Sequence, residues 1–371
     1  MDIPRTQQYS LEVQHRLGQN WMISLAYVGS HATRLNVNQS LDFVPLSDLP
    51  YTPSFQVNST GFTSGQLSTT VTNPFYGNVP TQYASLVTGT FLANAKATQS
   101  QLLLPYPQFT GVTEQWRPLG KSHYNSMQLE VSKRISMGLE FSASFIWSKC
   151  LQALGFLNAQ DSFPAQTYCQ YDVPREVKVN WVYFAPFGPG RRFLNHSNWV
   201  VSRLVSGWSL SATPMIQDGP PAPTPSSLMP IKGASEMTTN RTLTHWFNTC
   251  YINLSGVQKD CAGDGVAYHT DSTPAWQQMQ SGQLYEWSPF MHGVRYVGFH
   301  RLDASIKKET MIKERYQLTL RADAINAFNS SEWYNEMDTS YTDANFGMVG
   351  PPANTPGDDP RVIMISAQFR F

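Results

Sequence analysis

The feature that constrains this chain most is the alternation of apolar and polar residues along short segments. The clearest example is the segment 139–148, in which Leu139, Phe141 and Trp147 share one parity and Glu140 and Ser142 the other. A period of two places successive side chains on opposite faces of a β-strand. Each such strand therefore has one apolar face and one polar face.

The same alternation recurs along the chain and predicts nine strands. Each covers about 9–11 residues, the length that crosses a bilayer when a strand is tilted. The strands begin near Leu11, Trp21, Met127, Leu139, Val177, Trp208, Leu302, Tyr316 and Ile363. An all-β chain is expected.

The predicted connections alternate between short and long. The short ones are 17–19, 135–138 and 310–313, the long ones are 30–121, 150–174, 218–299 and 329–359, and 187–206 is intermediate. This alternation is typical of a transmembrane β-barrel, which has tight periplasmic turns and long extracellular loops. Within the intermediate connection we expect a short helix with Ser197 as N-cap and Gly207 after its end.

The number of strands indicates an incomplete barrel. If the short turns are periplasmic, the last strand runs inward and so does the first, which places residue 1 outside the cell. Single-chain bacterial barrels have an even number of strands and periplasmic termini. We therefore expect an antiparallel transmembrane β-barrel that is incomplete, about nine strands of a larger barrel, with long extracellular loops.

Composition agrees with a barrel in lipid. Charged residues make up 14% of the chain and aromatic residues 13%, whereas a soluble domain has about 25% charged residues. The net charge of zero gives no electrostatic reason to expect a nucleic-acid partner. The start, MDIPRTQQYS, has neither a basic region nor an apolar region of a signal peptide.

Aromatic and charged residues fit the two environments of such a barrel. Two aromatic girdles are expected at the membrane interfaces, and charged residues of the other parity are expected to face the lumen. The periplasmic girdle is Trp21, Phe141, Tyr183, Trp208, Tyr316 and Phe369, and the outer girdle is Tyr27, Trp147 and Phe328. The lumen-facing residues are Glu130, Glu140, Lys178, Arg321, Asp323 and Arg370.

The four cysteines fall into two close pairs, Cys150 with Cys169 and Cys250 with Cys261. Neither spacing is that of a zinc site. Two local disulfides in loops of an oxidising compartment are the favoured interpretation. Four unpaired thiols are the alternative.

No catalytic or cofactor-binding motif is found in the sequence. His269, near Asp264 and Asp271, is the one suggestive group, and a solvated loop explains it. Asp358 and Asp359 offer far fewer ligands than the 6–8 oxygens that calcium takes. We therefore expect no enzyme, no metal site and no cofactor, and we name no substrate-binding residue.

Several stretches, each weak alone, resemble the barrel of Oar-like TonB-dependent receptors. They cover nearly the whole chain in the family's order. They are QYSLEVQ (8–14), AYVGS (26–30) with Thr33, PYPQF (105–109), YNSMQ (124–128), WSK (147–149), PFGPGRRF (186–193), GW (207–208), GP (219–220), RLD (301–303), NAFN (326–329) and the terminal Phe371.

The resemblance implies uptake of a bulky nutrient through the outer membrane, energised by the TonB complex. In that family a plug domain fills the lumen and a TonB-contacting segment lies near the N-terminus. Neither is found in residues 1–371, nor is the family's carboxypeptidase-regulatory-like domain. The whole chain then corresponds to a partial receptor-type barrel domain that should not transport alone, and that reaches the TonB complex only through the missing parts.

The end of the chain resembles the signal that the barrel-assembly machinery recognises. Phe371, Phe369 and Ile365 share one face of the last strand. The expected partners are therefore this machinery and outer-membrane lipid, and the expected location is the bacterial outer membrane.

Two other functions remain open. The chain could be a surface adhesin or ligand-binding module, in which the long disulfide-bearing loops bind a partner and nothing is imported. It could also be a secreted all-β glycan-active enzyme that uses acids such as Asp264 and Asp271. A lipid-facing row of apolar residues argues against the second of these.

Overall fold

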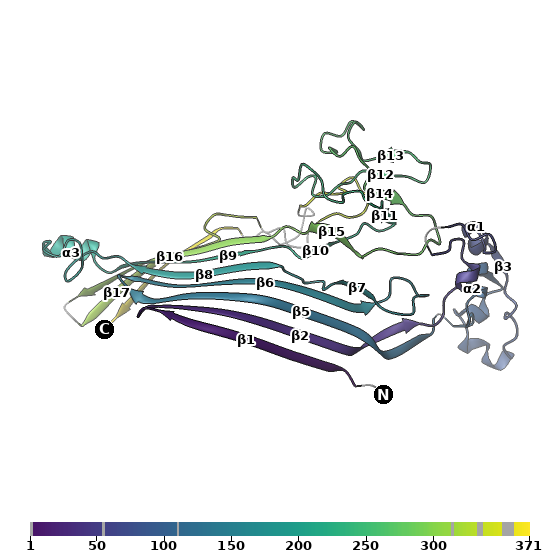
Figure 1. Cartoon of the computed structure of the whole chain (residues 1–371), viewed down its shortest axis with the longest axis horizontal. Coiled ribbons are helices and arrows are strands. Elements are labelled where there is room, and N and C mark those ends of the chain that lie inside the picture. Colours follow the sequence, from purple (N-terminus) through teal and green to yellow (C-terminus); the bar gives the residue numbers. More distant parts are fainter. Residues whose placement is uncertain (1–2, 54–55, 110, 313–314, 332–336, 351–359) are drawn as a thin grey trace.

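One large antiparallel sheet dominates the computed structural model, which describes residues 3–53, 56–109, 111–312, 315–331, 337–350 and 360–371 (Figure 1). Its order is β1-β2-β5-β6-β8-β9-β16-β17-β18, and a short strand, β7, also pairs with β6. The bounds are β1 Arg5–Leu17, β2 Trp21–Ser40, β5 Thr113–Ser136, β6 Leu139–Gly155, β7 Ala165–Tyr168, β8 Arg175–Phe184, β9 Trp208–Gln217, β16 Phe299–Ile312, β17 Tyr316–Ile325 and β18 Val362–Arg370. The all-β antiparallel class and the nine long strands are confirmed.

Three strands are much longer than the sequence predicted. β2, β5 and β6 have 20, 24 and 17 residues, so the first long loop covers 41–112 instead of 30–121. Alternation ends where these strands extend further, as at the stacked pair of His31 and His123, 4.2 Å between ring centroids. The extension of β5 at 113–121 has no regular alternation. In β2 the register shifts after Thr33, so the extension does not continue the apolar row that precedes it.

The strand register joins the apolar rows into one continuous face. Leu25 lies opposite Leu129, which lies opposite Phe145. Phe145 in turn pairs with Val177, and Val177 with Ile216. Paired residues share a face of the sheet, and a slip of one residue in any pair would turn that strand's row to the other side. The register therefore keeps the row of each strand on the same side.

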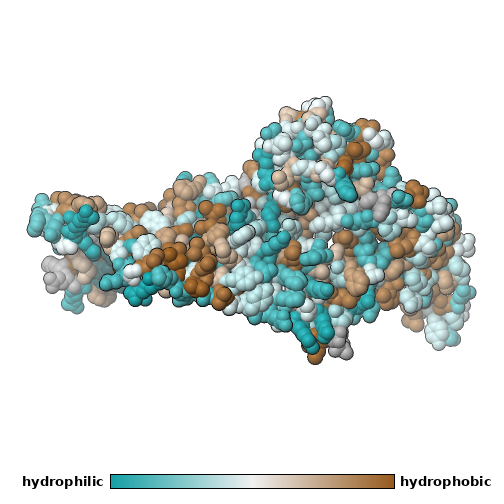
Figure 2. Space-filling view, viewed as in Figure 1, coloured by the Kyte–Doolittle hydropathy of each residue, from teal (hydrophilic) through white to brown (hydrophobic). Residues whose placement is uncertain are grey.

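This apolar face is exposed, and none of the segments that the structure describes packs on it as a second layer. Leu11 is 70% exposed and Ile365 is 82% exposed. The buried hydrophobic cluster lies elsewhere, in the long loops: Ala222, Leu228, Phe247, Ala275, Trp276, Met291, Val294 and Phe346. In Figure 2 hydrophobic residues likewise gather on the surface over the strands. A face of this kind suits hydrocarbon and not water.

The charged residues of the strands lie on the opposite face. The register puts Glu130 opposite Ser144 and Ser144 opposite Lys178. Farther along the sheet, Arg321 forms an ion pair with Asp323 at 2.7 Å. All six residues expected to face the lumen share this polar face: Glu130, Glu140, Lys178, Arg321, Asp323 and Arg370.

Aromatic side chains meet at both limits of the apolar band. At one limit Trp21 contacts Phe141, with ring centroids 6.4 Å apart, and Tyr316 stacks on Phe369 at 5.7 Å. At the other limit the hydroxyl of Tyr27 donates to Oδ1 of Asn125 at 2.7 Å. A ring in the apolar band with its hydroxyl bonded to a polar neighbour is the usual arrangement at a membrane interface.

The two ends of the sheet differ. The short-turn end holds the turns 18–20 and 137–138, and it also holds α3 (Trp199–Val205) between β8 and β9 (Figure 1). Met137 and Gly138 both have positive φ, 51° and 81°, as a type I′ hairpin requires. The helix between 187 and 206 is confirmed.

The expected N-cap of that helix was wrong by one residue. Oδ1 of Asn198 accepts the bond from the Val201 amide, at 2.9 Å. Ser197 instead hydrogen-bonds Ser202, 2.8 Å between their hydroxyl oxygens. Both residue types cap helices well, so sequence alone does not choose between two such neighbours. Gly207 follows the helix with a φ of +73°, as expected.

The long-loop end carries the remaining elements. The first loop, 41–112, holds η1 Leu46–Asp48, α1 Ser64–Ser68, β3 Thr70–Thr72, η2 Thr81–Leu86, η3 Phe91–Ala93, β4 Lys96–Thr98 and α2 Gln99–Leu102. The loop between β9 and β16 holds β10 Pro221–Pro223, β11 Leu228–Pro230, β12 Tyr251–Ile252, β13 Gln258–Lys259, β14 Trp276–Gln278 and β15 Phe290–Arg295. We call residues 219–296 together with 337–349 the loop subdomain.

The sheet does not close on itself among the described residues. There β1 pairs only with β2, and β18 pairs only with β17. None of the helices in the described ranges has the length and apolar character needed to cross a membrane. Asp358 and Asp359 lie outside the described residues.

Candidate functional site: a cavity at the long-loop end

The loop subdomain has a hydrophobic core of its own. Trp276 and Phe247 are fully buried and meet edge to face, with ring centroids 6.4 Å apart. Phe346, from the distant segment 337–349, packs on Phe247 at 5.3 Å. Nε1 of Trp276 donates to the Asn248 carbonyl at 2.5 Å, which satisfies the polar atom of the buried indole. The long loop is therefore a packed unit.

In the structure each close pair of cysteines is joined. Cys150 is bonded to Cys169 across the β6–β7 hairpin, with a Cα–Cα distance of 5.4 Å. Cys250 is bonded to Cys261 within the loop subdomain, at 4.4 Å. The two bonds lie on different parts of the long-loop end, one on β6 and one in the loop subdomain.

An ion pair fastens the loop subdomain to the β6–β7 hairpin. The guanidinium of Arg295 contacts Oδ2 of Asp172 at 2.6 Å, and the Asp172 side chain is 1% exposed. Oδ1 of Asp172 accepts a bond from the Cys150 amide at 2.6 Å. Arg295 also lies over the ring of Tyr168, 5.4 Å from its centroid. These contacts hold β15 beside the disulfide-bearing hairpin.

A second contact joins the same two parts. The side chain of Asn158 donates to the Tyr285 carbonyl at 2.8 Å and accepts from the Tyr285 amide at 2.8 Å. The loop subdomain and the β6–β7 hairpin are thus joined at two separate points.

A cavity of about 810 Å³ lies between these two parts. Its volume is within the range of small-molecule sites, about 300–1,000 Å³. One wall consists of Gln152, Leu154, Gly155, Phe156, Leu157, Ala165, Thr167, Gln170 and Tyr171. The other consists of Pro221, Pro223, Thr224, Pro225, Ser226, Tyr285, Trp287, Pro289, Phe290 and Tyr296.

The described lining of this cavity carries no Asp, Glu, Lys, Arg or His. Aromatic rings and prolines supply flat apolar surfaces, while Gln152, Gln170 and Thr167 supply hydrogen-bonding groups. Burial raises the pKa of Tyr296, which keeps its phenol neutral. The site therefore fits an uncharged ligand with flat faces and a few polar groups.

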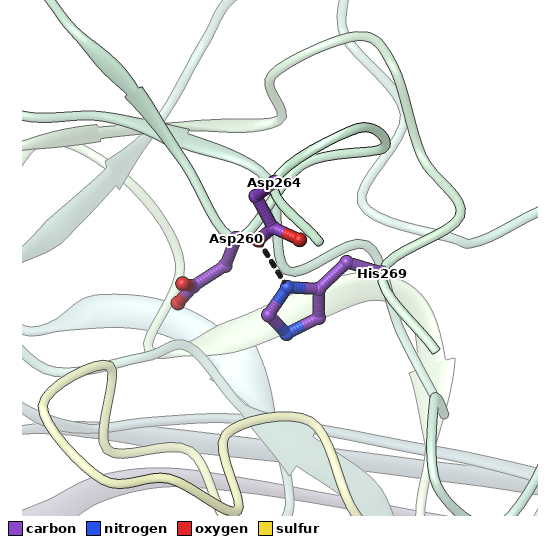
Figure 3. A group of neighbouring side chains, drawn as sticks. All are labelled: Asp260, Asp264 and His269. Atoms are coloured by element: carbon purple, nitrogen blue, oxygen red, sulfur yellow. Dashed lines mark hydrogen bonds and ion pairs between the residues drawn. The ribbon is translucent and has the colours of Figure 1, made fainter. Parts of the chain in front are cut away.

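A second group of polar side chains lies in the loop subdomain (Figure 3). Nδ1 of His269 is 2.5 Å from Oδ2 of Asp264, and donor atoms of Asp260, Asp264 and His269 lie within 4.8 Å of one another. Burial raises the pKa of Asp264, but the hydrogen bonds from His269 and the Val266 amide lower it by more. The pKa of Asp264 therefore lies below its ordinary value. Burial raises the pKa of Asp260.

Closeness in sequence predicted one partner of His269 correctly and one wrongly. Asp264 does contact His269, but Asp271 pairs with His245, with Oδ2 and Nε2 2.7 Å apart. The side chains of His269, Asp271 and His245 are 8%, 7% and 2% exposed. The loop that carries Asp264 is exposed, with 28% of the Asp264 side chain accessible, as a solvated loop requires. Asp271 differs from that interpretation, because it is buried against His245.

Sequence reasoning missed the cavity. Its walls come from segments that are distant in the chain and that have no periodic pattern. The aromatic run YEW at 285–287 and the proline-rich PPAPTP at 220–225 were the available signals, since such residues outside strands need another reason to be there.

Among comparisons with known proteins, a family model gives the clearest result. A family described as outer membrane beta barrel domain matches residues 1–363. No curated protein matches the sequence.

Several solved structures are similar to the chain at low identity. The outer membrane transporter YddB from Escherichia coli has a TM-score of 0.39 and 9% identity, with 99% of this chain and 32% of that chain covered. The ferric preacinetobactin receptor BauA from Acinetobacter baumannii has a TM-score of 0.39 and 11% identity, with 99% and 29% covered. P. aeruginosa FpvA, bound to heterologous pyoverdines, has a TM-score of 0.38 and 11% identity, with 98% and 27% covered. The chain thus spans about a third or less of the length of these proteins.

Proposed function

Because this chain belongs to the outer membrane beta barrel domain family, we propose that it is part of an outer-membrane receptor that takes up a bulky nutrient. Membership places it in the bacterial outer membrane as an all-β barrel protein whose sheet is open between β1 and β18. The cavity at the long-loop end is the site where the nutrient first binds.

The observation that carries this proposal is the position of the cavity. It lies at the end of the sheet with the long loops, where a barrel meets the outside of the cell. Two separate contacts, Arg295 with Asp172 and Asn158 with Tyr285, hold its walls. Below it, the polar face of the sheet offers side chains such as Arg321 and Asp323. A receptor needs both a preformed outer site and a polar path behind it.

The finer assignment rests on the sequence resemblance to Oar-like TonB-dependent receptors. On this proposal residues 1–371 are a partial receptor-type barrel domain. A plug and a TonB-contacting segment in other parts of the receptor would supply energy coupling, and this part would not transport alone.

The chemistry of the cavity suggests the class of nutrient. A charged ligand would lose its hydration shell on entering and would find no countercharge, which is costly. An uncharged oligosaccharide has flat apolar ring faces and hydroxyl groups, and it matches the aromatic rings and amides of the lining. We therefore propose a neutral oligosaccharide as the ligand class.

Binding tests the proposal in outer membranes isolated from the bacterium that makes the protein. We expect maltoheptaose, a neutral oligosaccharide, to bind better than an oligogalacturonate of the same length. Trp287→Ala should weaken binding by about tenfold or more, as loss of a central aromatic contact does. Trp116→Ala is the matched control, because Trp116 is 62% exposed and lies outside the cavity lining.

Uptake separates the receptor from the adhesin. If the cells bind the oligosaccharide through Trp287 and accumulate it, the receptor is supported. Binding without accumulation would favour a surface ligand-binding module, which the separate core of the loop subdomain also suits. Equal loss of binding in both tryptophan variants would argue against the cavity as the site.

Two further proposals concern assembly. We propose that Phe371, Phe369 and Ile365 are recognised by the barrel-assembly machinery, since all three are more than half exposed on the edge strand or just after it. We also propose that both cysteine pairs are oxidised in the mature protein, as expected outside the cytosol. Mass spectrometry of unreduced peptides tests the second.

A further inference from the structure

The connection between β8 and β9 is unlike the other described connections at the short-turn end. The turns 18–20 and 137–138 simply reverse the chain, whereas 185–207 forms an excursion that holds α3 (Figure 1). The excursion lies at the end of the sheet opposite the cavity.

The burial pattern of this excursion is inverted relative to a helix in water. Trp199 is 73% exposed and Leu204 is 66% exposed, while the polar Ser202 is buried. Phe193 and Leu194, just before the helix, are about half exposed. A helix of a soluble domain turns its apolar residues inward. An excursion that turns them outward is suited to an apolar environment.

The excursion is fastened to the lipid-facing side of the sheet. Nε1 of Trp208 donates to the Leu204 carbonyl at 2.8 Å, and Trp208 shares the apolar face with Leu210 on β9. The amine of Lys308, which lies opposite Trp208 in the register, donates to the Ser206 carbonyl. The end of α3 is therefore continuous with the face that the membrane covers.

The charge of the excursion has one sign. Residues 185–207 contain Arg191, Arg192 and Arg203 and no Asp or Glu. The Arg203 guanidinium lies over the Trp199 ring at 5.6 Å, and that of Arg192 lies over the Phe193 ring at 5.5 Å. A cation beside an outward aromatic ring suits the layer where headgroup phosphates meet acyl chains.

The same pairing is repeated elsewhere at this end of the sheet. Lys308 lies 5.7 Å from the ring of Trp208, and Lys133 lies 5.8 Å from the ring of Trp21. In each case the two residues are direct cross-strand partners on the apolar face. The lysines can reach the headgroup layer while their stems stay in the apolar band.

We propose that residues 185–207 are a membrane-surface element that binds anionic phospholipid at the short-turn end. Trp199, Leu204 and their apolar neighbours enter the acyl layer of the inner leaflet, and the three arginines contact the headgroup phosphates. The element fixes the depth of the sheet in the membrane. This inference is independent of the ligand of the cavity.

A fluorophore on a single introduced cysteine tests the position of the element. The full chain carrying Leu204→Cys is labelled in isolated outer membranes. Its emission should be shifted to the blue, quenched by a shallow nitroxide lipid and protected from aqueous iodide. Leu86→Cys is the matched control, because Leu86 is a 77% exposed leucine at the long-loop end, and its label should behave oppositely. Iodide access at 204 equal to that at 86 would overturn the proposal.

Charge reversal tests the lipid chemistry. The labelled protein is purified from the outer membrane together with the partner segments that it carries there, and is reconstituted in phosphatidylethanolamine vesicles with or without phosphatidylglycerol. Partition of the label into the membrane should increase with phosphatidylglycerol. Arg191→Glu, Arg192→Glu and Arg203→Glu together should remove this increase. Each basic residue near an anionic surface contributes on the order of fivefold to partition into the membrane. Lys96→Glu, Lys232→Glu and Lys259→Glu, which reverse exposed charges at the other end, should leave it unchanged.

Two outcomes would contradict the proposal even in a folded protein. One is the same emission with and without phosphatidylglycerol in the unaltered chain. The other is protection of position 204 in cells but not in protein-free vesicles, which would mean that a periplasmic protein covers the element. An Ala143→Cys label on β6 reports in the same vesicles that the sheet itself has inserted.

Discussion

Asp172 shows how single residues hold the candidate site together. One carboxylate oxygen accepts the Cys150 amide and the other contacts Arg295. Its side chain is 1% exposed, so the charge depends on these partners for its stabilisation. A comparable ion pair, Arg175 with Asp218, lies in a more open place, where the arginine side chain is 68% exposed.

Asp172→Asn should loosen the walls of the cavity. The substitution removes the partner of Arg295 and should cost up to about 3–5 kcal/mol, as when a buried ion pair loses one member. Hydrogen exchange should become faster across β6, β7 and β15. Asp218→Asn is the control and should cost about 0.2–1 kcal/mol, since that pair is screened by water. Equal effects of the two variants would contradict the role given to Asp172.

The acidic residues near His269 predict opposite pH effects. The pKa of Asp264 is lowered in the folded protein, so its contribution is present above the pKa of the unfolded chain, about 3.9, and is lost as pH falls through the lower folded value. The pKa of Asp260 is raised by burial. Its carboxyl therefore favours folding at low pH, and this contribution is lost as pH rises through the folded value.

Hydrogen exchange of the segment 250–271, in membranes at neutral pH, measures this difference. Asp264→Asn should speed exchange, because it removes a carboxylate that the fold stabilises. Asp260→Asn should slow exchange or leave it unchanged. Faster exchange in the Asp260 variant than in the Asp264 variant would show that the assignment is reversed.

At the scale of elements, the register decides what each strand shows to its surroundings. The I′ turn at 137–138 sets the pairing of β5 with β6. That pairing puts Val131 beside Ala143 on the apolar face, and Ser132 beside Ser142 on the polar face. Neighbouring residues of β6 therefore face opposite environments.

Arginine at two neighbouring positions of β6 tests this arrangement. Ala143→Arg should destabilise the inserted sheet by about 2–4 kcal/mol, as arginine does on the lipid face near the midplane. Ser142→Arg should have little effect, since its side chain lies on the polar face. Urea unfolding of the protein in lipid vesicles provides the comparison. Similar losses at both positions would mean that β6 has no lipid-facing side.

The sequence predicted those elements whose two faces meet different environments. Alternation around Phe141 and Trp147 was enough to place β6, its face and its turn. The extension of β5 at 113–121 has no regular alternation. That of β2 follows register shifts after Thr33 and buries Val37 and Gln39 at the long-loop end. The cavity depends on contacts such as that of Asn158 with Tyr285, 127 residues apart in sequence, and no local signal encodes a contact of that range.

For the whole molecule, two features dominate: an exposed apolar face and two unpaired edges. β1 and β18 are exposed along their full length. Unpaired strand edges readily pair with other chains, and hydrocarbon cannot satisfy their amides and carbonyls. Residues 1–371 therefore depend on lipid for one face and on further pairing for the edges.

Expressed alone and without detergent, the full chain should aggregate. Its apolar face would meet water, and its edges would pair with those of other copies. Size-exclusion chromatography with light scattering measures this directly. A monodisperse monomer in plain buffer would contradict the claim that the apolar face is exposed. A monomer that forms only in detergent would agree with it.

The most direct test of the central claim is the accessibility of consecutive β6 positions to reagents in lipid and in water. Spin labels are placed singly at positions 141 to 146 in the outer membrane of the bacterium that makes the protein, and collisions with oxygen and with a water-soluble nickel chelate are measured. The account predicts a period of two, with 141, 143 and 145 accessible to oxygen and 142, 144 and 146 accessible to nickel. Odd positions that neither reagent reaches would show that this face is covered by protein, and the assignment to lipid would be wrong.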